Sequence, residues 1–294
     1  MIIDVHVHTS KHKLRGLHTA DADIGDIQTW ATQYGISRMY ILATYFPLKR
    51  SGLHNEEMLR RIEGNPLFGC FGSLDMENNL VEGIQELEQL ADQEKIEGIK
   101  LYPGYQNVSL SDLTLHPIFE LARKFGLPIA CHMGELHHCC SKEERTAGNY
   151  RCGADHCPLD VRSALAMPSE LKAVAKKFPD VLFLASHLAN PFFEELREAM
   201  SECGNIYTDI SGQFLSASDE DTPEYRKFLA SEITKFLHIN NGVERVLFGT
   251  DFPIQSYRDT LELVNALNLN PAEKQMVLSE NALRILPPRT RRKK

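Results

Sequence analysis

The chain has 294 residues, of which 43% are hydrophobic and 24% are charged, a composition typical of a globular protein with a sizeable core. Its net charge of −8 argues against general nucleic-acid binding, and no apolar run approaches the roughly 20 residues that span a bilayer. The start of the sequence shows no secretory signal, so we expect a cytoplasmic protein. Seven cysteines, an odd number, favour thiols or metal ligands over a disulfide framework.

Short apolar segments alternate with amphipathic helical stretches along the chain. The predicted strands are 2–8, 38–43, 67–73, 98–102, 128–132, 181–187, 206–209 and 245–250. Helical runs are predicted between some of them, at 80–93, 115–124 and 169–177. Turn residues such as Gly126 and Pro179 separate the two kinds of segment. This alternation predicts right-handed βαβ units with parallel strands.

The first predicted strand carries two histidines one residue apart, in the run MIIDVHVH. Strict alternation along a strand would place Asp4, His6 and His8 on one face, and Val5 and Val7 on the other. Two imidazoles above a carboxylate are costly to bury unless something pairs with them. A divalent metal would do so. The alternative is a histidine-rich edge strand that is open to water.

Polar residues also end three later strands, namely His132, His187 and Asp251. The residues before them on the same face are small or apolar, as we expect for Phe183 and Ala185 below His187. Metal ligands must converge to within roughly 2 Å of one ion, but the first and last strands of an open eight-stranded sheet do not meet. Closing the sheet collects these ends on one rim, where such barrels carry their active sites. The sequence therefore predicts a (β/α)8 TIM barrel.

Five motifs taken together resemble the amidohydrolase superfamily. In chain order they are DVHVH, GIKLYPGYQ, CHMGE, ASHL and LFGTDFP. Within the superfamily, the sequence is similar to the amidohydrolase-related branch of metal-dependent hydrolases that includes aminocarboxymuconate-semialdehyde decarboxylase. The resemblance covers nearly the whole chain, from Ile3 to Leu286. It implies the metallo-dependent hydrolase type of barrel.

The resemblance also implies a metal site formed by His6, His8, His132 and Asp251. His187 would be either a further ligand or a base that deprotonates the attacking water. Asp251 would pass the proton of that water to the leaving group, so that Asp251 and His187 are the implied catalytic residues. Three imidazoles and a carboxylate favour zinc, although manganese, iron and cobalt accept the same ligand types. We expect one ion rather than two.

Lys100 has three open interpretations. On the fourth strand it shares a face with Gly98 and Tyr102. In binuclear relatives a lysine on this strand is carboxylated and bridges two metals, whereas one metal suffices in the decarboxylase-like branch. Lys100 would then be a cation for a substrate carboxylate, or a buried amine paired with an acid.

A loop at about 135–160, rich in cysteine and histidine, follows the fifth strand, and the family pattern does not require its cysteines. Three interpretations stay open: a second, structural metal site, cysteines placed near the catalytic metal, or a solvated lid. The residues of the second metal site would be Cys139, Cys140, Cys152, His156 and Cys157.

The loops after the strands should set substrate specificity. A basic first loop around Arg15, with Tyr102 and Tyr105 after the fourth strand, suits a small anionic or aromatic substrate. The favoured function is a metal-dependent hydrolase. The alternatives are a non-oxidative decarboxylase on the same site and a non-catalytic metal-binding barrel. We expect one domain over 1–294 with a basic tail at about 288–294, no nucleic-acid or membrane partner, and leave a homodimer open.

Overall fold

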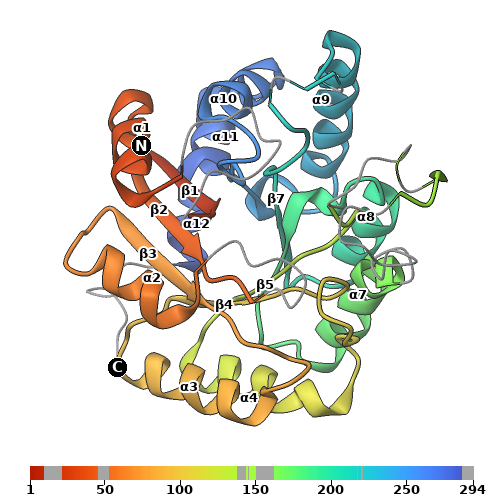
Figure 1. Ribbon diagram of the computed structural model, residues 1–294. Coiled ribbons are helices and arrows are strands. Elements are labelled where there is room, and N and C mark those ends of the chain that lie inside the picture. Colours follow the sequence, from red (N-terminus) through yellow and green to blue (C-terminus); the bar gives the residue numbers. More distant parts are fainter. Residues whose placement is uncertain are drawn as a thin grey trace.

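The computed structural model describes residues 1–9, 22–45, 53–137, 144, 146–149, 162–216, 218–219 and 221–286. Within this part of the chain, eight parallel strands neighbour one another in sequence order (Figure 1). They are β1 (Ile2–Val7), β2 (Ile36–Leu42), β3 (Phe68–Gly72), β4 (Gly98–Leu101), β5 (Ile129–Cys131), β6 (Phe183–Ala185), β7 (Ile206–Asp209) and β8 (Val246–Leu247). Each predicted strand is therefore present, and most are shorter than the sequence pattern indicates.

Hydrogen bonds between the first strand and the segment after β8 close the barrel. The backbone N–H of His8 donates to the carbonyl of Phe252 at 2.8 Å, and the N–H of Asp251 donates to the carbonyl of His6 at 2.7 Å. The two ends of the sheet are thus neighbours, which confirms the predicted barrel. Closure brings residues some 245 positions apart in the sequence onto one rim.

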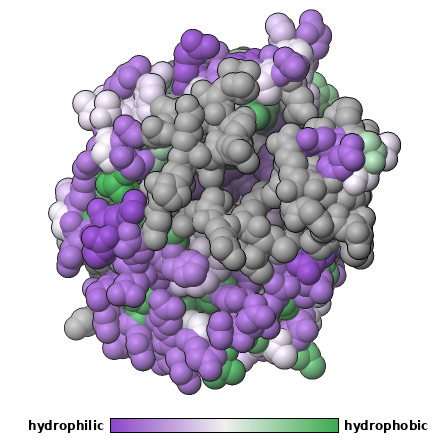
Figure 2. Space-filling model, in the orientation of Figure 1, coloured by the Kyte–Doolittle hydropathy of each residue, from purple (hydrophilic) through white to green (hydrophobic). Residues whose placement is uncertain are grey.

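Helices surround the strands, and hydrophilic side chains cover most of the described surface that Figure 2 shows over α3 and α4. The helices are α1 (Ile24–Tyr34), α2 (Asn55–Ile62), α3 (Leu80–Asp92), α4 (His116–Phe125), α7 (Pro168–Lys177), α8 (Phe193–Glu202), α9 (Pro223–Leu237), α10 (Tyr257–Ala266), α11 (Pro271–Gln275) and α12 (Asn281–Ile285). Short 3-10 helices span Leu113–Leu115, Ser163–Ala166, Ser186–Ala189 and Val243–Arg245, and a π-helix spans Met276–Glu280. Gly126 ends α4 in a left-handed conformation, as its turn signal predicts.

Two large apolar clusters, and a small third one of Tyr102, Tyr105, Leu136 and Ala166, fill the described part of the molecule. The outer cluster packs the strands against the surrounding helices and includes Val7 of β1 and Ile27 of α1. The inner cluster fills the barrel and includes Leu184 and Leu247, with α12 residues such as Ile285 packed against them. The hydroxyl of Tyr40 in this cluster donates to the carbonyl of residue 286, just after α12, at 3.0 Å. The terminal helix therefore seals the amino-terminal end of the barrel.

Strict alternation fails at β1, so our expectation that Val5 and Val7 share a face was wrong. Val5 belongs to the inner cluster and Val7 to the outer one. The register with β2 shifts between Asp4 and Val7. The Asp4 carboxylate accepts the backbone N–H of His6 at 3.0 Å and that of Thr250 at 3.1 Å. Such a local side-chain bond competes with the strand ladder and lets the backbone bulge.

Alternation holds within β6 but does not continue to His187, below which we expected Phe183 and Ala185. Both pack in the outer cluster, whereas Leu184 faces the barrel interior. The backbone turns after the strand, because His187 and Leu188 have left-handed φ values of 63° and 53°. A strand pattern cannot be extended through such a turn.

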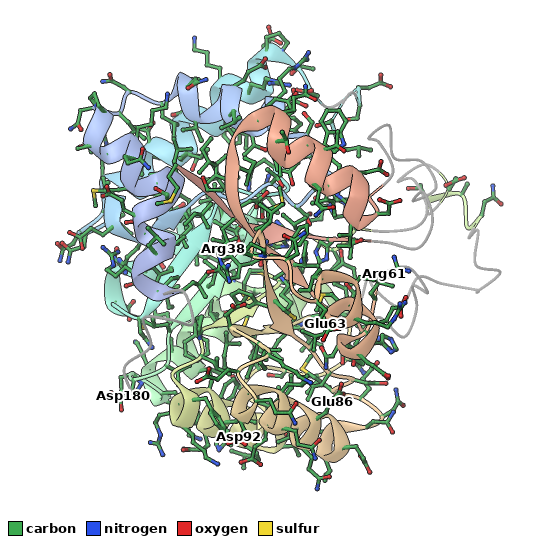
Figure 3. The ribbon with its side chains drawn as sticks, turned by 90° about the vertical axis from the view of Figure 1, so that its left-hand side faces the viewer. Arg38, Arg61, Glu63, Glu86, Asp92 and Asp180 are labelled. Atoms are coloured by element: carbon green, nitrogen blue, oxygen red, sulfur yellow. The ribbon has the colours of Figure 1, made fainter. Side chains whose placement is uncertain are left out.

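A cavity of about 920 Å³ opens between α2 and α3 and contains none of the predicted site residues. Figure 3 labels three of its charged lining residues, Arg38 from β2, Glu63 after α2 and Glu86 from α3. The guanidinium of Arg38 pairs with Glu97 at 2.8 Å. No helix in the described part of the chain is long and apolar enough to cross a membrane.

Candidate metal and active site

Two histidines and an aspartate converge on the rim at the carboxyl end of the barrel. His6 and His8 come from the end of β1, and Asp251 follows β8. The Asp251 Oδ1 atom lies 3.3 Å from His8 Nε2 and 3.5 Å from His6 Nε2. The ligand atoms that the three residues offer all lie within 4.8 Å of one another. Barrel closure thus assembles side chains from both ends of the sheet.

The other two predicted rim histidines join this group. The rings of His187 and His6 have centroids 4.7 Å apart, and those of His187 and His132 are 5.0 Å apart. His132 Nε2 lies 3.2 Å from the carbonyl of Glu135, and the ring of Tyr105 packs against His132 at 4.7 Å. The structure therefore brings the predicted rim histidines and Asp251 into one cluster.

The residues present fit a divalent cation. His6 Nε2 is buried and has no hydrogen-bond partner, which is costly for a polar atom. It faces Asp251 Oδ1, a negatively charged acceptor, which His8 Nε2 also faces. Imidazole nitrogens and a carboxylate oxygen are ligands that zinc, manganese and related metals accept. A cation among these atoms would satisfy all of them.

Burial keeps the imidazoles of His6, His8 and His187 neutral, which is the form that binds metals. Desolvation, followed by the charge of Lys100, lowers the pKa of His8 to about 3. Desolvation is also the largest cause that lowers the pKa of His6 and of His187 far below the usual range.

Lys100 is fully buried inside the barrel. Its ammonium donates to the hydroxyl of Ser186 at 2.7 Å and lies 5.2 Å from the centroid of the Tyr102 ring. Desolvation lowers the pKa of Lys100 to about 8, although the charges of Asp209 and Asp251 act in the opposite direction. The lysine is therefore close to the acidic groups of the rim and still largely protonated at neutral pH.

Sequence reasoning missed two residues of this cluster, Asp209 and Ser211. Asp209 Oδ2 lies 3.1 Å from His6 Nδ1, and its Oδ1 accepts the backbone N–H of His187 at 3.1 Å. The signal was available, because Asp209 ends the predicted strand 206–209 just as Asp251 follows the last one. Ser211 carried no signal of its own, since a serine after a strand is ordinary turn chemistry.

The backbone around the cluster takes conformations that most residues avoid. His187 has a φ of 63° and Asp251 a φ of 59°, each worth roughly 1–3 kcal/mol of strain. Gly212, with a φ of 58°, leaves room for both, because a Cβ atom there would lie 2.7 Å from His187 Nδ1 and 2.8 Å from Asp251 Oδ2. Strain of this kind is common where side chains are held for function.

Several predicted residues lie outside the described part of the chain. They are Arg15 of the first loop, the basic tail, and Cys139, Cys140, Cys152, His156 and Cys157 of the Cys- and His-rich loop. Tyr102 and Tyr105 are described and buried. The Tyr102 hydroxyl donates to the carbonyl of residue 43 at 2.7 Å, and the Tyr105 hydroxyl accepts the backbone N–H of His137 at 2.7 Å.

Three solved structures share the fold at low sequence identity. An uncharacterised TIM-barrel protein from Bordetella bronchiseptica is 17% identical, with 97% of this chain and 98% of that chain covered and a TM-score of 0.72. A dihydroxybenzoic acid decarboxylase from Polaromonas, solved with manganese and 2-nitroresorcinol, is 14% identical, with 97% and 96% covered and a TM-score of 0.67. A probable 2-pyrone-4,6-dicarboxylic acid hydrolase from Acinetobacter baumannii, solved with citric acid, is 12% identical, with 97% and 98% covered and a TM-score of 0.64. These likenesses show the TIM-barrel fold alone.

A search of curated proteins finds no match to the sequence. The family model of the amidohydrolases, however, matches residues 52–287. This match covers most of the chain and contains His132, His187 and Asp251, and it begins after the strand that carries His6 and His8. The chain therefore belongs to the amidohydrolase family, as its motifs indicate.

Proposed function

We propose that this protein is a metal-dependent hydrolase that acts on a small anionic or aromatic molecule. One observation carries the proposal: the nitrogen atom His6 Nε2 is buried without a hydrogen-bond partner, next to Asp251 Oδ1 and close to His8. One divalent ion would be held by His6, His8, His132 and Asp251, and His187 would lie beside these ligands. We favour zinc, and manganese is the alternative, since a decarboxylase of the same fold was solved with that metal.

The ion, when bound, would polarise the bond to be cleaved and lower the pKa of a water molecule. The chain's own residues would then position and move protons. Asp251 is fixed by its backbone bond to His6 and carries a buried carboxylate that can accept a proton from water and pass it to the leaving group. Burial keeps His187 neutral next to the rings of His6 and His132, where it can accept a hydrogen bond from the attacking water and orient it.

Lys100 supports an anionic substrate. Its buried ammonium donates a hydrogen bond to the neutral hydroxyl of Ser186. Its positive charge raises the electrostatic potential at the rim. In a low-dielectric interior this charge favours a carboxylate or phosphate above it. We therefore assign Lys100 to substrate electrostatics rather than to a carbamate bridge. Tyr102, Tyr105 and Arg15 are the proposed contacts for the rest of the substrate.

A non-oxidative decarboxylase on the same site is the second candidate. The manganese-containing structure with 2-nitroresorcinol shows that one protein of this fold is a decarboxylase that binds a small aromatic molecule. Here the substrate would lose its carboxylate as carbon dioxide, and a protonated rim group would deliver a proton to the ring carbon. A non-catalytic barrel is disfavoured, because a decayed enzyme would have lost part of the rim cluster.

Product analysis separates the two enzymes. The metal-loaded protein is incubated with a panel of aromatic esters, lactones and carboxylates in water labelled with heavy oxygen. Labelled oxygen in the organic product identifies hydrolysis, whereas release of carbon dioxide, with a proton gained by the ring and no labelled oxygen in the aromatic product, identifies decarboxylation. The Asp251→Asn variant, tested in parallel, should be inactive in either case.

Metal content tests the site itself. Elemental mass spectrometry of the wild-type protein should find about one equivalent of a divalent metal, and the His6→Ala variant should lose it. Tyr40→Phe, a substitution in the apolar inner cluster, is the control and should keep the metal. The proposal fails if His6→Ala retains the wild-type metal content and the wild-type fold.

A further inference from the structure

The segment after β7 places an aspartate and a serine behind two of the rim histidines. Asp209 and Ser211 are fully buried. Asp209 Oδ2 lies 3.1 Å from His6 Nδ1. Ser211 Oγ lies 3.1 Å from His6 Nδ1 and 3.0 Å from His187 Nδ1. Both histidines therefore turn their Nδ1 atoms toward this pair.

The hydrogen bonds of the pair fix the direction in which each proton points. Asp209 Oδ1 accepts the backbone N–H groups of His187 and Ser211, both at 3.1 Å, and the Ser211 hydroxyl also donates to it. A carboxylate oxygen that receives these hydrogens acts as an acceptor. Since the hydroxyl hydrogen of Ser211 points to Asp209 Oδ1, the serine oxygen can only accept hydrogen bonds from the histidines.

Each histidine therefore has only acceptors at its Nδ1 atom. His6 Nδ1 faces the Asp209 carboxylate and the Ser211 oxygen. His187 Nδ1 faces the same hydroxyl oxygen and the backbone carbonyl of Ser211, 3.1 Å away. A ring nitrogen among acceptors carries the hydrogen. In a neutral imidazole the other nitrogen, Nε2, then carries no hydrogen and presents a lone pair.

We propose that Asp209 and Ser211 are positioning residues that hold His6 and His187 as Nδ1–H tautomers, so that both present an Nε2 lone pair to the rim. For His6 this explains why a buried Nε2 has no hydrogen-bond partner beside the Asp251 carboxylate. The Nε2 lone pair of His6 becomes a metal ligand, and that of His187 becomes a hydrogen-bond acceptor. These two consequences rest on the proposed function, whereas the tautomers do not.

A competing interpretation is that His6, His187 and Asp209 form a metal site of their own, because their ligand atoms also lie within 4.8 Å of one another. The hydrogen bonds argue against it. Asp209 Oδ1 already accepts two amide groups and a hydroxyl, and a metal on His187 Nδ1 would displace the bond to the Ser211 carbonyl. A second equivalent of metal would reveal such a site.

Nitrogen NMR of the metal-free protein tests the tautomers directly. Protein labelled with 15N in its histidines is stripped of metal and measured at pH 8, where an imidazole of ordinary pKa is neutral. Long-range proton–nitrogen correlations distinguish Nδ1–H from Nε2–H rings, and the His6→Gln and His187→Gln variants assign the signals. We expect Nδ1–H for both histidines in the wild type.

Three variants and a control separate positioning from general stability. Ser211→Ala should raise the share of the Nε2–H tautomer of His187, since only the backbone carbonyl of residue 211 then accepts from Nδ1. Asp209→Asn should populate the Nε2–H tautomer of His6, and Ser211→Thr, which keeps the hydroxyl, should restore the wild-type pattern. Ser216→Ala is the matched control, since it removes another buried serine that donates to a carboxylate, that of Asp259 at 2.6 Å. The control should leave both tautomers unchanged.

Metal affinity is the second measurement. Ser211→Ala should weaken binding of Zn²⁺ or Mn²⁺ by about 10–100-fold, as loss of an outer partner of a ligand usually does, and Ser216→Ala should not. Nε2–H rings in the wild type, or tautomers that neither Ser211→Ala nor Asp209→Asn changes, would overturn the inference. A second metal equivalent lost in Asp209→Asn would also overturn it. If the tautomers are as expected but the wild type binds no metal, the inference stands and the proposed function fails.

Discussion

The two ends of the barrel interior are built from neighbouring residues of the same strands but from opposite kinds of side chain. At the amino-terminal end, Val5, Leu184 and Leu247 are buried in an apolar cluster that α12 seals. At the carboxyl end, one or a few residues further along, His6 and Asp251 are buried as well. The apolar end needs no partners to be stable, whereas every polar atom at the other end needs one.

The difference shows that stability and the candidate site are located at opposite ends of the barrel. Burying apolar area supplies stability, of the order of 25 cal/mol per Å². Burying imidazoles and carboxylates lowers the stability of the folded state unless each group has a hydrogen bond or a bound cation. Asp209 is paired within the protein, whereas His6 Nε2 is a buried rim nitrogen that lacks a hydrogen bond. The two ends should therefore respond to substitution in opposite ways.

The largest effect should come from Asp251→Asn at the polar end. The amide cannot accept a proton and is a poor metal ligand, so we expect kcat/KM to fall by about 10³-fold, which is roughly 4 kcal/mol. The metal-free variant should unfold at the same or higher urea concentration than the metal-free wild type, because a buried charge is gone. A clear loss of metal-free stability would show that Asp251 is structural.

The apolar end should behave in the reverse manner. Leu184→Ala creates a cavity in the inner cluster and should lower the free energy of unfolding by about 2–5 kcal/mol, measured by urea denaturation. The metal content of the folded variant should stay at the wild-type value. Leu113→Ala is the control, because Leu113 is 70% exposed and should change stability by no more than about 0.5 kcal/mol. A loss of metal in Leu184→Ala would contradict the separation of the two ends.

Metal itself should stabilise the polar end. A ligand that binds only the folded state adds about 2.7 kcal/mol at a free concentration of 100 times its Kd. We expect Tm in thermal denaturation to rise when Zn²⁺ or Mn²⁺ is added to the stripped wild type. His6→Ala should show no such rise, and an equal rise in that variant would place the bound metal elsewhere.

The smallest effect should come from Tyr40→Phe, at the seal between the inner cluster and α12. The change removes the hydroxyl that donates to the carbonyl of residue 286 and should cost about 1 kcal/mol. Amide hydrogen exchange in α12 should become faster, while exchange at the rim stays as in the wild type. Faster exchange at the rim would mean that the two ends are coupled.

The sequence by itself determined the strands, three of the helices (α3, α4 and α7) and the closed barrel. Each strand is signalled locally, by a short apolar run between turn residues, and the alternation with helices follows from the order of those runs. Five rim residues were also predictable, because a histidine or aspartate at the end of an apolar strand stands out. Asp251 follows the last strand in this way, and Asp209 ends the predicted strand 206–209 with the same signal.

Only the tertiary structure decided which side chains face one another. Ser211 meets His6 across more than 200 residues, and Lys100 meets Ser186, which follows another strand, β6. The bulge at Asp4 depends on Thr250, which barrel closure brings beside it. Alternation is a local rule of the extended backbone, and it ends where side chains from distant strands bond to the backbone or turn it. Those contacts depend on closure and stagger of the barrel, which no local pattern encodes.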